Sequence, residues 1–499
     1  MRQNSSIYEI FQERCHYNSD KTFLIFEEKD YTYQEIWDMV NFEVQNLLEF
    51  GVRKGDKLGL LMENSPEFIV IYLAVARLGM VLVPINPKYS QEYIFNIFDS
   101  LNIKYAILDD HFYDNGYSQS LKTIVPDIIF LNRITKENTL TVQKRNRNLS
   151  YDEGVINDDF VILFTSGSTG NPKGVVHTQK DLILNSLGVI EFLSLTQKDI
   201  FLFSFPLTSM FGIGYTTTVI LLLGSIVLMK LYEPDMALKL IEKYRATVHS
   251  GHISMFNMEM NQRNLSDYNL DSLRLGMVGG EMINGEFLLK VRDMLGLKLY
   301  QCYGMTEAAG AITLVKGNAD MKEWISSAGK PLPGVKLKIV NINGNEISEN
   351  EIGEIYCKAE YFAKKYYIDG KEIPLSIDGW FRTQDIGYIL DGCLCISGRK
   401  ADLITMKGKI VFISQIESRL SKLNFCASTA IIYQNDYLYI FISTIKNEII
   451  SEKLIFDVIK NMFDGKEMST FVKIMIIQQF PLTYTGKIDR LKLANWIKD

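Results

Sequence analysis

The first half of the chain alternates short apolar runs with helical stretches. Residues 57–62 and 81–84 are apolar runs of strand length, and residues 65–78 between them are typical of a helix opened by Ser65-Pro66-Glu67. The same alternation continues to about residue 278. Strands that alternate with helices predict βαβ units, and therefore mainly parallel sheets covered by helices.

The pattern changes after residue 330 to short strands and turns. The segments 334–340, 353–357 and 387–396 predict a small β subdomain. From Gly398 onward the chain carries strand and helix patterns of its own, enough for a small α+β domain. We therefore predict an α/β protein with a large domain over residues 1–397 and a small C-terminal domain over residues 398–499.

Composition narrows the class of protein. A chain of 499 residues with 47% hydrophobic and 22% charged residues is expected to form two or more globular domains. The net charge of −6 disfavours a nucleic-acid partner, because neutralising phosphates needs clustered Lys and Arg. The apolar stretch 219–229 is too short to span a bilayer and predicts a core helix and strand.

The start of the chain and its cysteines bear on the compartment. No apolar signal region follows Met1, and the six cysteines are scattered, so reduced core thiols are expected rather than disulfides or metal ligands. These features predict a cytoplasmic protein.

A loop rich in hydroxyl groups and glycine follows the apolar run 160–164, which predicts a buried strand. It contains four hydroxyl residues, three glycines and one lysine in ten positions, Thr165-Ser166-Gly167-Ser168-Thr169-Gly170-Asn171-Pro172-Lys173-Gly174. Glycines let backbone N–H groups approach an anion, and lysine adds a mobile positive charge, so the loop predicts polyphosphate binding. It is not a Walker A loop, because Gly174 follows the lysine where that motif needs Ser or Thr.

This string closely resembles the phosphate loop of the adenylate-forming superfamily, and the chain is closest in pattern to its acyl- or aryl-CoA ligases. The resemblance extends over nearly the whole length and includes Gly51-Val52-Arg53-Lys54-Gly55-Asp56 near the start. It implies a large N-terminal domain that binds ATP or AMP and a small, mobile C-terminal domain.

A second motif, Tyr303-Gly304-Met305-Thr306-Glu307, places an aromatic ring, a hydroxyl and a carboxylate on one tight turn. By resemblance Tyr303 stacks on adenine, Thr306 contacts the α-phosphate and Glu307 helps to hold Mg²⁺. One carboxylate is enough for Mg²⁺, which takes its remaining ligands from phosphate oxygens and water. The preceding Gly280 and Glu281 resemble the strand-end turn that borders the adenine.

Two motifs nearer the C-terminus also resemble parts of the family's nucleotide site. They are Trp380–Gly387, which resembles the ribose-binding motif, and Gly398–Asp402, which resembles the junction between the two domains. Asp385 is the expected ligand of the ribose hydroxyls, and Arg399 is expected to reach the nucleotide. Ala401 takes the hinge position, where the family usually has Asp or Lys. The departure removes a polar anchor but leaves the backbone freedom of the hinge.

Lys487 lies in Pro481-Leu482-Thr483-Tyr484-Thr485-Gly486-Lys487, which resembles the family's C-terminal catalytic motif. In that motif the lysine contacts the carboxylate and the α-phosphate, where negative charge gathers during attack. A preorganised positive charge of this kind is often the largest catalytic contribution. Lys487, Thr306 and Glu307 are the predicted catalytic residues.

The predicted substrate pocket is formed by Ser209, Met210 and Phe211. Met210 cannot pair with a substrate ammonium group, so an uncharged aliphatic or aryl acid is favoured over an amino acid. His249 and His252 lie near the same pocket and could be metal ligands, but no nearby Cys or carboxylate completes a metal set in the sequence. Satisfied polar packing is the favoured interpretation for both histidines.

The resemblance implies a two-step reaction. A carboxylic acid and Mg–ATP give an acyl-adenylate and pyrophosphate, and a thiol then displaces AMP after the small domain rotates about Ala401. Coenzyme A is the expected thiol, and the phosphopantetheine of an acyl or peptidyl carrier protein is the alternative. A luciferase-like oxygenase, a non-catalytic binding protein and a phosphate-releasing NTPase are the rival classes.

Overall fold

The computed structural model describes residues 5–109, 112, 116–125, 128–130, 153–165, 173–280, 283, 285–316, 320–376, 378–406, 409–421, 423, 425–444, 451–460, 470–481 and 488–497. The chain divides into two compact units. The first comprises Met1–Leu337, Cys357–Phe381 and Leu390–Cys395, and the second comprises Lys338–Tyr356, Arg382–Ile389 and Ile396–Asp499. The division at residue 398 stays a prediction, since the second unit also takes two segments before that residue.

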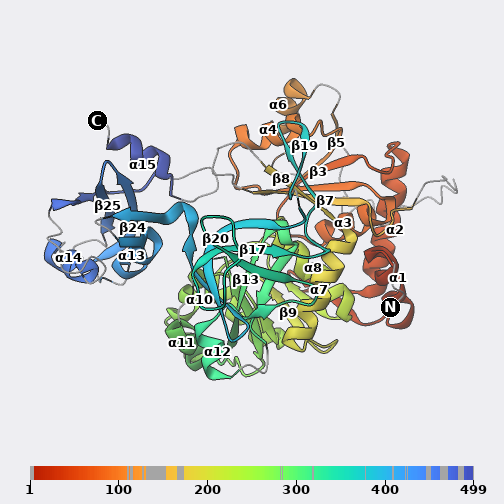
Figure 1. Ribbon diagram of the computed structural model, residues 1–499. Coiled ribbons are helices and arrows are strands. Elements are labelled where there is room, and N and C mark those ends of the chain that lie inside the picture. Colours follow the sequence, from red (N-terminus) through yellow and green to blue (C-terminus); the bar gives the residue numbers. More distant parts are fainter. Residues whose placement is uncertain are drawn as a thin grey trace. The chain divides into compact units, whose positions relative to one another are not determined.

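A nine-stranded sheet is the largest element of the first unit (Figure 1). Its order is β15 (Lys330–Pro331), β14 (Gly310–Leu314), β13 (Lys298–Met305), β12 (Leu275–Gly279), β11 (Val248–His249), β9 (Ile200–Phe203), β10 (Ser225–Leu228), β1 (Thr22–Phe26) and β2 (Lys29–Thr32). The run from β13 to β1 is parallel throughout, and β14, β15 and β2 are added antiparallel. The alternation of strands and helices expected to continue to about residue 278 is confirmed by β9, β10, β11 and β12.

An eight-stranded sheet lies in the same unit. Its order is β19 (Lys371–Pro374), β18 (Lys365–Ile368), β8 (Lys173–Thr178), β7 (Asp159–Thr165), β4 (Val81–Ile85), β3 (Lys57–Leu61), β5 (Tyr105–Leu108) and β6 (Ile129–Phe130). The strands from β7 to β6 are parallel, whereas β7, β8, β18 and β19 pair antiparallel in turn. The expected strands at 57–62, 81–84 and 160–164 are therefore confirmed.

Two buried helices fill the interior of this unit. Eleven of the 13 residues of α3 (Pro66–Leu78) are buried, because the helix is apolar on every side. It starts at Pro66 after Ser65 and ends at Gly79, which takes the left-handed conformation common after helices. Tyr72 of α3 shares a hydrogen bond of 2.8 Å with Thr217 of α8 (Met210–Leu222), so these two hydroxyl groups are paired inside the core.

The other helices of the first unit surround these sheets. They are α1 (Ile7–Tyr17), α2 (Tyr33–Glu49), α4 (Gln91–Ser100), α6 (Tyr117–Ile124), α7 (Gln179–Leu193), α9 (Pro234–Tyr244), α10 (Ile253–Met260), α11 (Gly285–Leu295) and α12 (Met321–Ser326). The apolar stretch 219–229 is the end of α8 followed by β10, as expected. None of the helices in the described part of the chain is long and apolar enough to cross a bilayer.

The predicted β-rich segment forms a four-stranded sheet in the order β16 (Lys336–Val340), β17 (Gly353–Lys358), β20 (Phe381–Leu390) and β21 (Cys393–Arg399). The segment 387–396 contains the end of β20 and the start of β21, because Asp391 and Gly392 take positive φ angles of 53° and 72° and turn the chain between them.

The C-terminal part of the second unit is a small α+β fold. A hairpin of β22 (Leu403–Met406) and β23 (Lys409–Phe412) leads into α13 (Ile413–Leu420). A sheet of β24 (Cys426–Gln434), β25 (Tyr437–Thr444) and β26 (Val472–Ile476) follows, with α14 (Glu452–Lys460) and α15 (Arg490–Trp496).

Alternation along β25 explains how this sheet is covered. Leu438, Ile440 and Ile442 pack with α13 and α14, while Tyr439 and Phe441 pack with Leu493 of α15. Both α13 and α15 lie against β24 (Figure 1). The predicted fold class, α/β with mainly parallel sheets and a terminal α+β domain, is confirmed.

Candidate active site

The carboxyl ends of four parallel strands gather the candidate residues of the first unit. Strands β9, β11, β12 and β13 are consecutive neighbours, with Gly279 paired to Cys302 and Gly251 bridged in parallel to Val278. Parallel strands end at one edge of a sheet, which is where α/β proteins bind ligands. The segments that leave this edge are 204–211, 250–252, 280 and 303–307.

The turn after β13 is tightly constrained. Strand β13 ends at Met305, and the short 3₁₀ helix η3 (Thr306–Ala308) turns the chain back into β14. A Cβ atom on Gly304 would stand 2.0 Å from the carbonyl oxygen of Gly310 on the paired strand. Only glycine fits that approach, so Gly304 fixes the crossing that presents Thr306 and Glu307.

Two side chains from the eight-stranded sheet hold this turn. His177 of β8 donates from Nε2 to the backbone oxygen of Thr306 at 2.6 Å, and Tyr366 of β18 donates its hydroxyl to Oε1 of Glu307 at 2.9 Å. The backbone N–H of Ala363 donates to the backbone oxygen of Glu307 at 2.9 Å. The turn is therefore fixed by strands of the other sheet.

Tyr366 is a neutral hydrogen-bond donor to Glu307. Burial, reinforced by the adjacent Glu307 carboxylate, raises the pKa of Tyr366 above its usual value. The phenol keeps its proton and engages one of the two carboxylate oxygens. Sequence analysis missed both His177 and Tyr366, because neither belongs to a motif and only the pairing of β8 with β18 brings them to the turn.

The two ends of the predicted phosphate loop are placed by the β7–β8 pair. Thr165, the last residue of β7, is in register with Lys173, the first residue of β8. Lys173 is two residues from Val175, which pairs with Tyr366. The loop thus starts and ends near the strand pair that contacts Glu307.

Several predicted site residues lie outside the residues that the structure describes. They are Ser166, Gly167, Ser168, Thr169 and Gly170 of the phosphate loop, Glu281 and Lys487. Gly280 is described and follows β12 with a φ of 86°.

Asp385, Arg399 and Ala401 belong to the second unit. Asp385 is 4% exposed, and Nε of Arg399 lies 3.3 Å from its Oδ1. The backbone N–H of Asp385 donates to Oγ1 of Thr383 at 3.1 Å. Ala401 lies in the exposed 3₁₀ helix η4 (Lys400–Asp402), directly after this ion pair.

The predicted substrate residues begin α8. Ser209 caps the helix, because its Oγ accepts from the N–H of Gly212 at 3.1 Å. Phe211 packs with Phe205 and Tyr215 at ring-centroid distances of 4.7 and 4.9 Å. An aromatic cluster therefore adjoins Met210, which agrees with an apolar pocket.

Asn64 fixes the loop before α8. Its Nδ2 donates to the backbone oxygens of Phe205 and Met229, and its Oδ1 accepts from the N–H of Leu207. All three distances lie between 2.8 and 3.0 Å, so the loop is tied to the residue that follows β3. Sequence analysis gave no sign of this role for Asn64.

The two histidines after β11 differ. His249 is fully buried and lies 2.9 and 3.1 Å from the two carboxylate oxygens of Glu259, also fully buried, which supports a packing role. His252 is exposed at the start of α10, and its ring lies within 3.7–3.8 Å of the position that a Cβ atom of Gly280 would take. His252 thus borders the predicted adenine turn.

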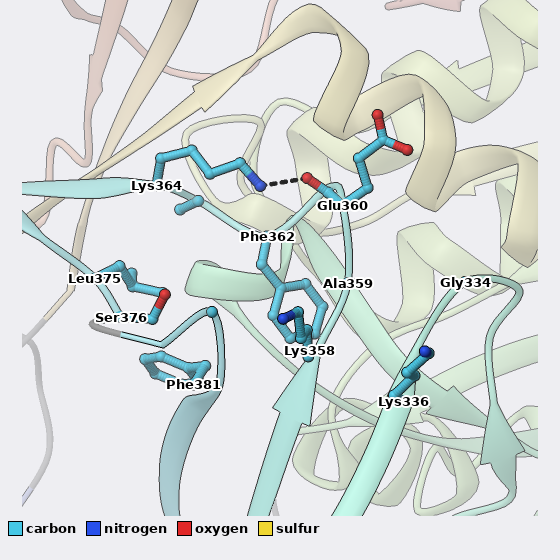
Figure 2. Close-up of a pocket in the computed structure, with 12 residues that line it drawn as sticks. Gly334, Lys336, Lys358, Ala359, Glu360, Phe362, Lys364, Leu375, Ser376 and Phe381 are labelled. Carbon is cyan, nitrogen blue, oxygen red and sulfur yellow. Dashed lines mark hydrogen bonds between the residues drawn. The ribbon is translucent and has the colours of Figure 1, made fainter.

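A pocket of about 420 Å³ is lined in part by residues 358–364, the segment whose Ala363 contacts Glu307. Figure 2 shows Lys364 directed to the backbone oxygen of Glu360, with the Glu360 carboxylate turned away; that carboxylate contacts Lys180 at 2.5 Å. Lys336, Lys358 and Phe362 complete the walls (Figure 2). Its exposed lysines distinguish this pocket from the apolar site expected for the acid.

The residues present suit Mg²⁺ bound together with nucleotide phosphates. Among the described residues, no group of three or more His, Cys, Asp or Glu side chains could hold a metal ion. In the part of the chain that the structure describes, only one carboxylate oxygen of Glu307, Oε1, accepts a hydrogen bond. Such a site matches Mg²⁺, which binds through one or two carboxylates plus phosphate oxygens.

Known proteins resemble this chain over most of its length. The family described as AMP-binding enzyme matches residues 11–367. The 4-coumarate–CoA ligase 3 of Arabidopsis thaliana is 27% identical over 500 residues, covering 95% of this chain and 88% of that protein. The 2-succinylbenzoate–CoA ligase of Bacillus pumilus is 28% identical over 411 residues, covering 82% of this chain and 81% of that protein.

A solved structure shares the fold. The O-succinylbenzoate coenzyme A synthetase of Bacillus subtilis, in complex with ATP and a magnesium ion, superposes with a TM-score of 0.85 and covers 100% of both chains at 22% identity. At this identity the similarity establishes the architecture alone.

Gly304→Ala should lower the midpoint of thermal unfolding, because the new Cβ would overlap the Gly310 carbonyl oxygen. Crowding of this kind costs about 1–3 kcal/mol. Gly214→Ala is the matched control: it lies within α8 with nothing within 4 Å of the added Cβ, and should leave the midpoint unchanged or raise it. Equal midpoints for both variants would contradict the constraint at Gly304.

Proposed function

The chain belongs to the AMP-binding enzyme family, and from this premise we propose that it is an AMP-forming acid–thiol ligase. It activates a carboxylic acid with Mg–ATP and transfers the acyl group to a thiol, most simply coenzyme A. The observation that carries the proposal is the Tyr303–Glu307 turn, held at the carboxyl edge of the sheet by His177 and Tyr366.

In the first step an oxygen of the substrate carboxylate attacks the α-phosphorus of ATP. The bond from that phosphorus to the oxygen bridging the β-phosphate breaks, and pyrophosphate leaves. Positioning and charge stabilisation supply most of the rate enhancement in such chemistry. Mg²⁺, when bound, would neutralise phosphate charge, with Glu307 as its carboxylate ligand.

The chain's own residues divide the remaining tasks. The loop from Thr165 to Lys173 holds the β- and γ-phosphates, and Thr306 contacts the α-phosphate. Lys487 stabilises the charge that develops during attack.

The nucleoside is bound by a second set of residues. Tyr303 stacks on adenine, which Gly280 and Glu281 border. Asp385 binds the ribose hydroxyls, and Arg399 reaches the nucleotide.

In the second step the thiol sulfur attacks the acyl carbon. The bond from that carbon to the AMP oxygen breaks, AMP leaves and the thiol proton passes to solvent. We propose that residues 398–499 rotate about Ala401 between the steps, withdrawing Lys487. The reaction is proposed to occur in the cytoplasm.

The substrate class follows from the start of α8. Met210 and the ring cluster of Phe205, Phe211 and Tyr215 present thioether and aromatic surface, which suits an uncharged aliphatic or aryl acid. The relatives named above act on 4-coumarate and 2-succinylbenzoate, both aryl acids. Ser209 is engaged in capping α8.

A panel of aliphatic, aryl and amino acids tests the substrate class and the thiol together. With ATP, aryl or aliphatic acids should release pyrophosphate faster than amino acids, and coenzyme A should yield the thioester. Thioester on acyl carrier proteins alone would establish the alternative acceptor. Release of phosphate rather than pyrophosphate, with no acid dependence, would overturn the proposal.

Lys487→Ala should reduce acyl-adenylate formation by about 10²–10³-fold, the effect of removing one preorganised donor. Thioester formation from a supplied acyl-adenylate should remain close to that of the unmodified enzyme. Lys492→Ala, which removes an exposed lysine of α15, is the matched control and should leave both steps unchanged. An equal loss of both steps in Lys487→Ala would remove its assigned role.

A further inference from the structure

Glu354 of β17 joins the two segments of the second unit that carry the proposed nucleotide contacts. Its Oε1 accepts a hydrogen bond from Nε2 of Gln384 at 3.3 Å, and its Oε2 lies 2.8 Å from Nζ of Lys400. Gln384 directly precedes Asp385, and Lys400 directly follows Arg399. One carboxylate thus contacts the neighbours of both members of the Asp385–Arg399 ion pair.

The next residue of β17 strengthens this connection. The backbone oxygen of Ile355 accepts from Oγ1 of Thr383 at 2.8 Å, and the same hydroxyl accepts from the N–H of Asp385 at 3.1 Å. The two residues before Asp385 are therefore both held by two consecutive residues of β17. Because Asp385 is buried, its orientation depends on this backbone support.

Gln384 has a conformation that needs such support. Its φ is 64°, in the left-handed region that side chains other than glycine rarely adopt. Unfavourable backbone angles persist at functional sites only where the surroundings hold them. The hydrogen bond from the Gln384 side chain to Glu354 provides that restraint immediately before Asp385.

We propose that Glu354 is a positioning residue for nucleotide binding, acting with Lys400. It fixes the backbone ahead of Asp385 and the segment after Arg399, so that the carboxylate and the guanidinium face the nucleotide together. The pair also supplies a polar anchor one residue before Ala401, where the hinge position itself has none. The inference rests on the proposed function, through the role of Asp385.

The geometry favours a role in positioning over one in general stability. Glu354 is 11% exposed at its side chain and Lys400 is 55% exposed, so the ion pair is half open to solvent. Exposed ion pairs contribute little to the free energy of folding. Loss of such a pair changes the equilibrium constant that it affects, for folding or for binding, by about fivefold at most. An effect of that size on the site is measurable while the fold stays intact.

The test compares Michaelis constants for ATP and for the acid in a pyrophosphate-release assay, with binding of AMP measured by calorimetry. Glu354→Gln and Lys400→Ala should each raise the KM for ATP and weaken AMP binding by about fivefold. The KM for the acid and the midpoint of thermal unfolding should stay unchanged. Glu351→Gln, an exposed acid just before β17, is the matched control and should behave like the unmodified enzyme.

A charge exchange separates positioning from simple loss of structure. Glu354→Lys alone should weaken AMP binding further, and combining it with Lys400→Glu should restore most of the affinity. Gln384 can turn its amide to accept from the new lysine, so both contacts re-form in the exchanged pair.

Unchanged ATP and AMP constants in Glu354→Gln and Lys400→Ala would overturn the inference, as would equal changes in the ATP and acid constants. Failure of the charge exchange to restore AMP affinity would also count against it. A wild-type protein that binds AMP but releases no pyrophosphate with any acid would instead overturn the proposed function.

Discussion

The hydrogen bonds from His177 and Tyr366 to the Thr306–Glu307 turn are the constraint on which the candidate active site depends. The carboxyl edge of the nine-stranded sheet collects the segments proposed to bind the acid and the adenine, whereas the proposed phosphate loop connects β7 and β8 of the other sheet. β8 and β18 join the two sheets at this turn, and Asn64, which comes after β3, joins them again at the loop before α8. The glycine at 304 serves the same end, because it lets β14 pass close enough for the turn to form.

Much of this arrangement could be predicted from the sequence because its signals are local. The strands at 57–61, 81–85 and 159–165 are apolar runs of the length typical of buried strands. The start of α3 is marked in the sequence by Ser65-Pro66. The Tyr303–Glu307 motif is five consecutive residues, the last three of β13 and the first two of η3, so they are neighbours in any fold. By contrast the segment 387–396 was predicted only as part of a region of short strands and turns, and the position of its turn at Asp391–Gly392 was not, since an aspartate with positive φ gives little sign in the sequence.

The contacts that could not be predicted join residues far apart in the chain. Tyr366 reaches Glu307 across 59 positions and His177 reaches Thr306 across 129. No sequence motif around His177 or Tyr366 indicates these contacts. They arise from the pairing of β8 with β18, which depends on the whole sheet. The same holds for Glu354, whose partners Gln384 and Lys400 lie 30 and 46 positions away. The sequence motifs there were identified by the adjacent Asp385 and Arg399. In the sequence, Ala401 lacks the polar side chain that the family usually has at the hinge position. In the structure, the adjacent Lys400 forms an ion pair with Glu354.

The bond from Tyr366 to Glu307 has a consequence for ion selectivity. A carboxylate with one oxygen engaged by a phenol presents a single oxygen to a cation, so chelation through both oxygens is disfavoured. Ca²⁺ commonly uses two-oxygen carboxylate ligation and a crowded, variable shell, whereas Mg²⁺ accepts one oxygen and completes a strict octahedron with phosphate and water. In the proposed magnesium site, Tyr366 of β18 would therefore favour the smaller ion before any nucleotide binds.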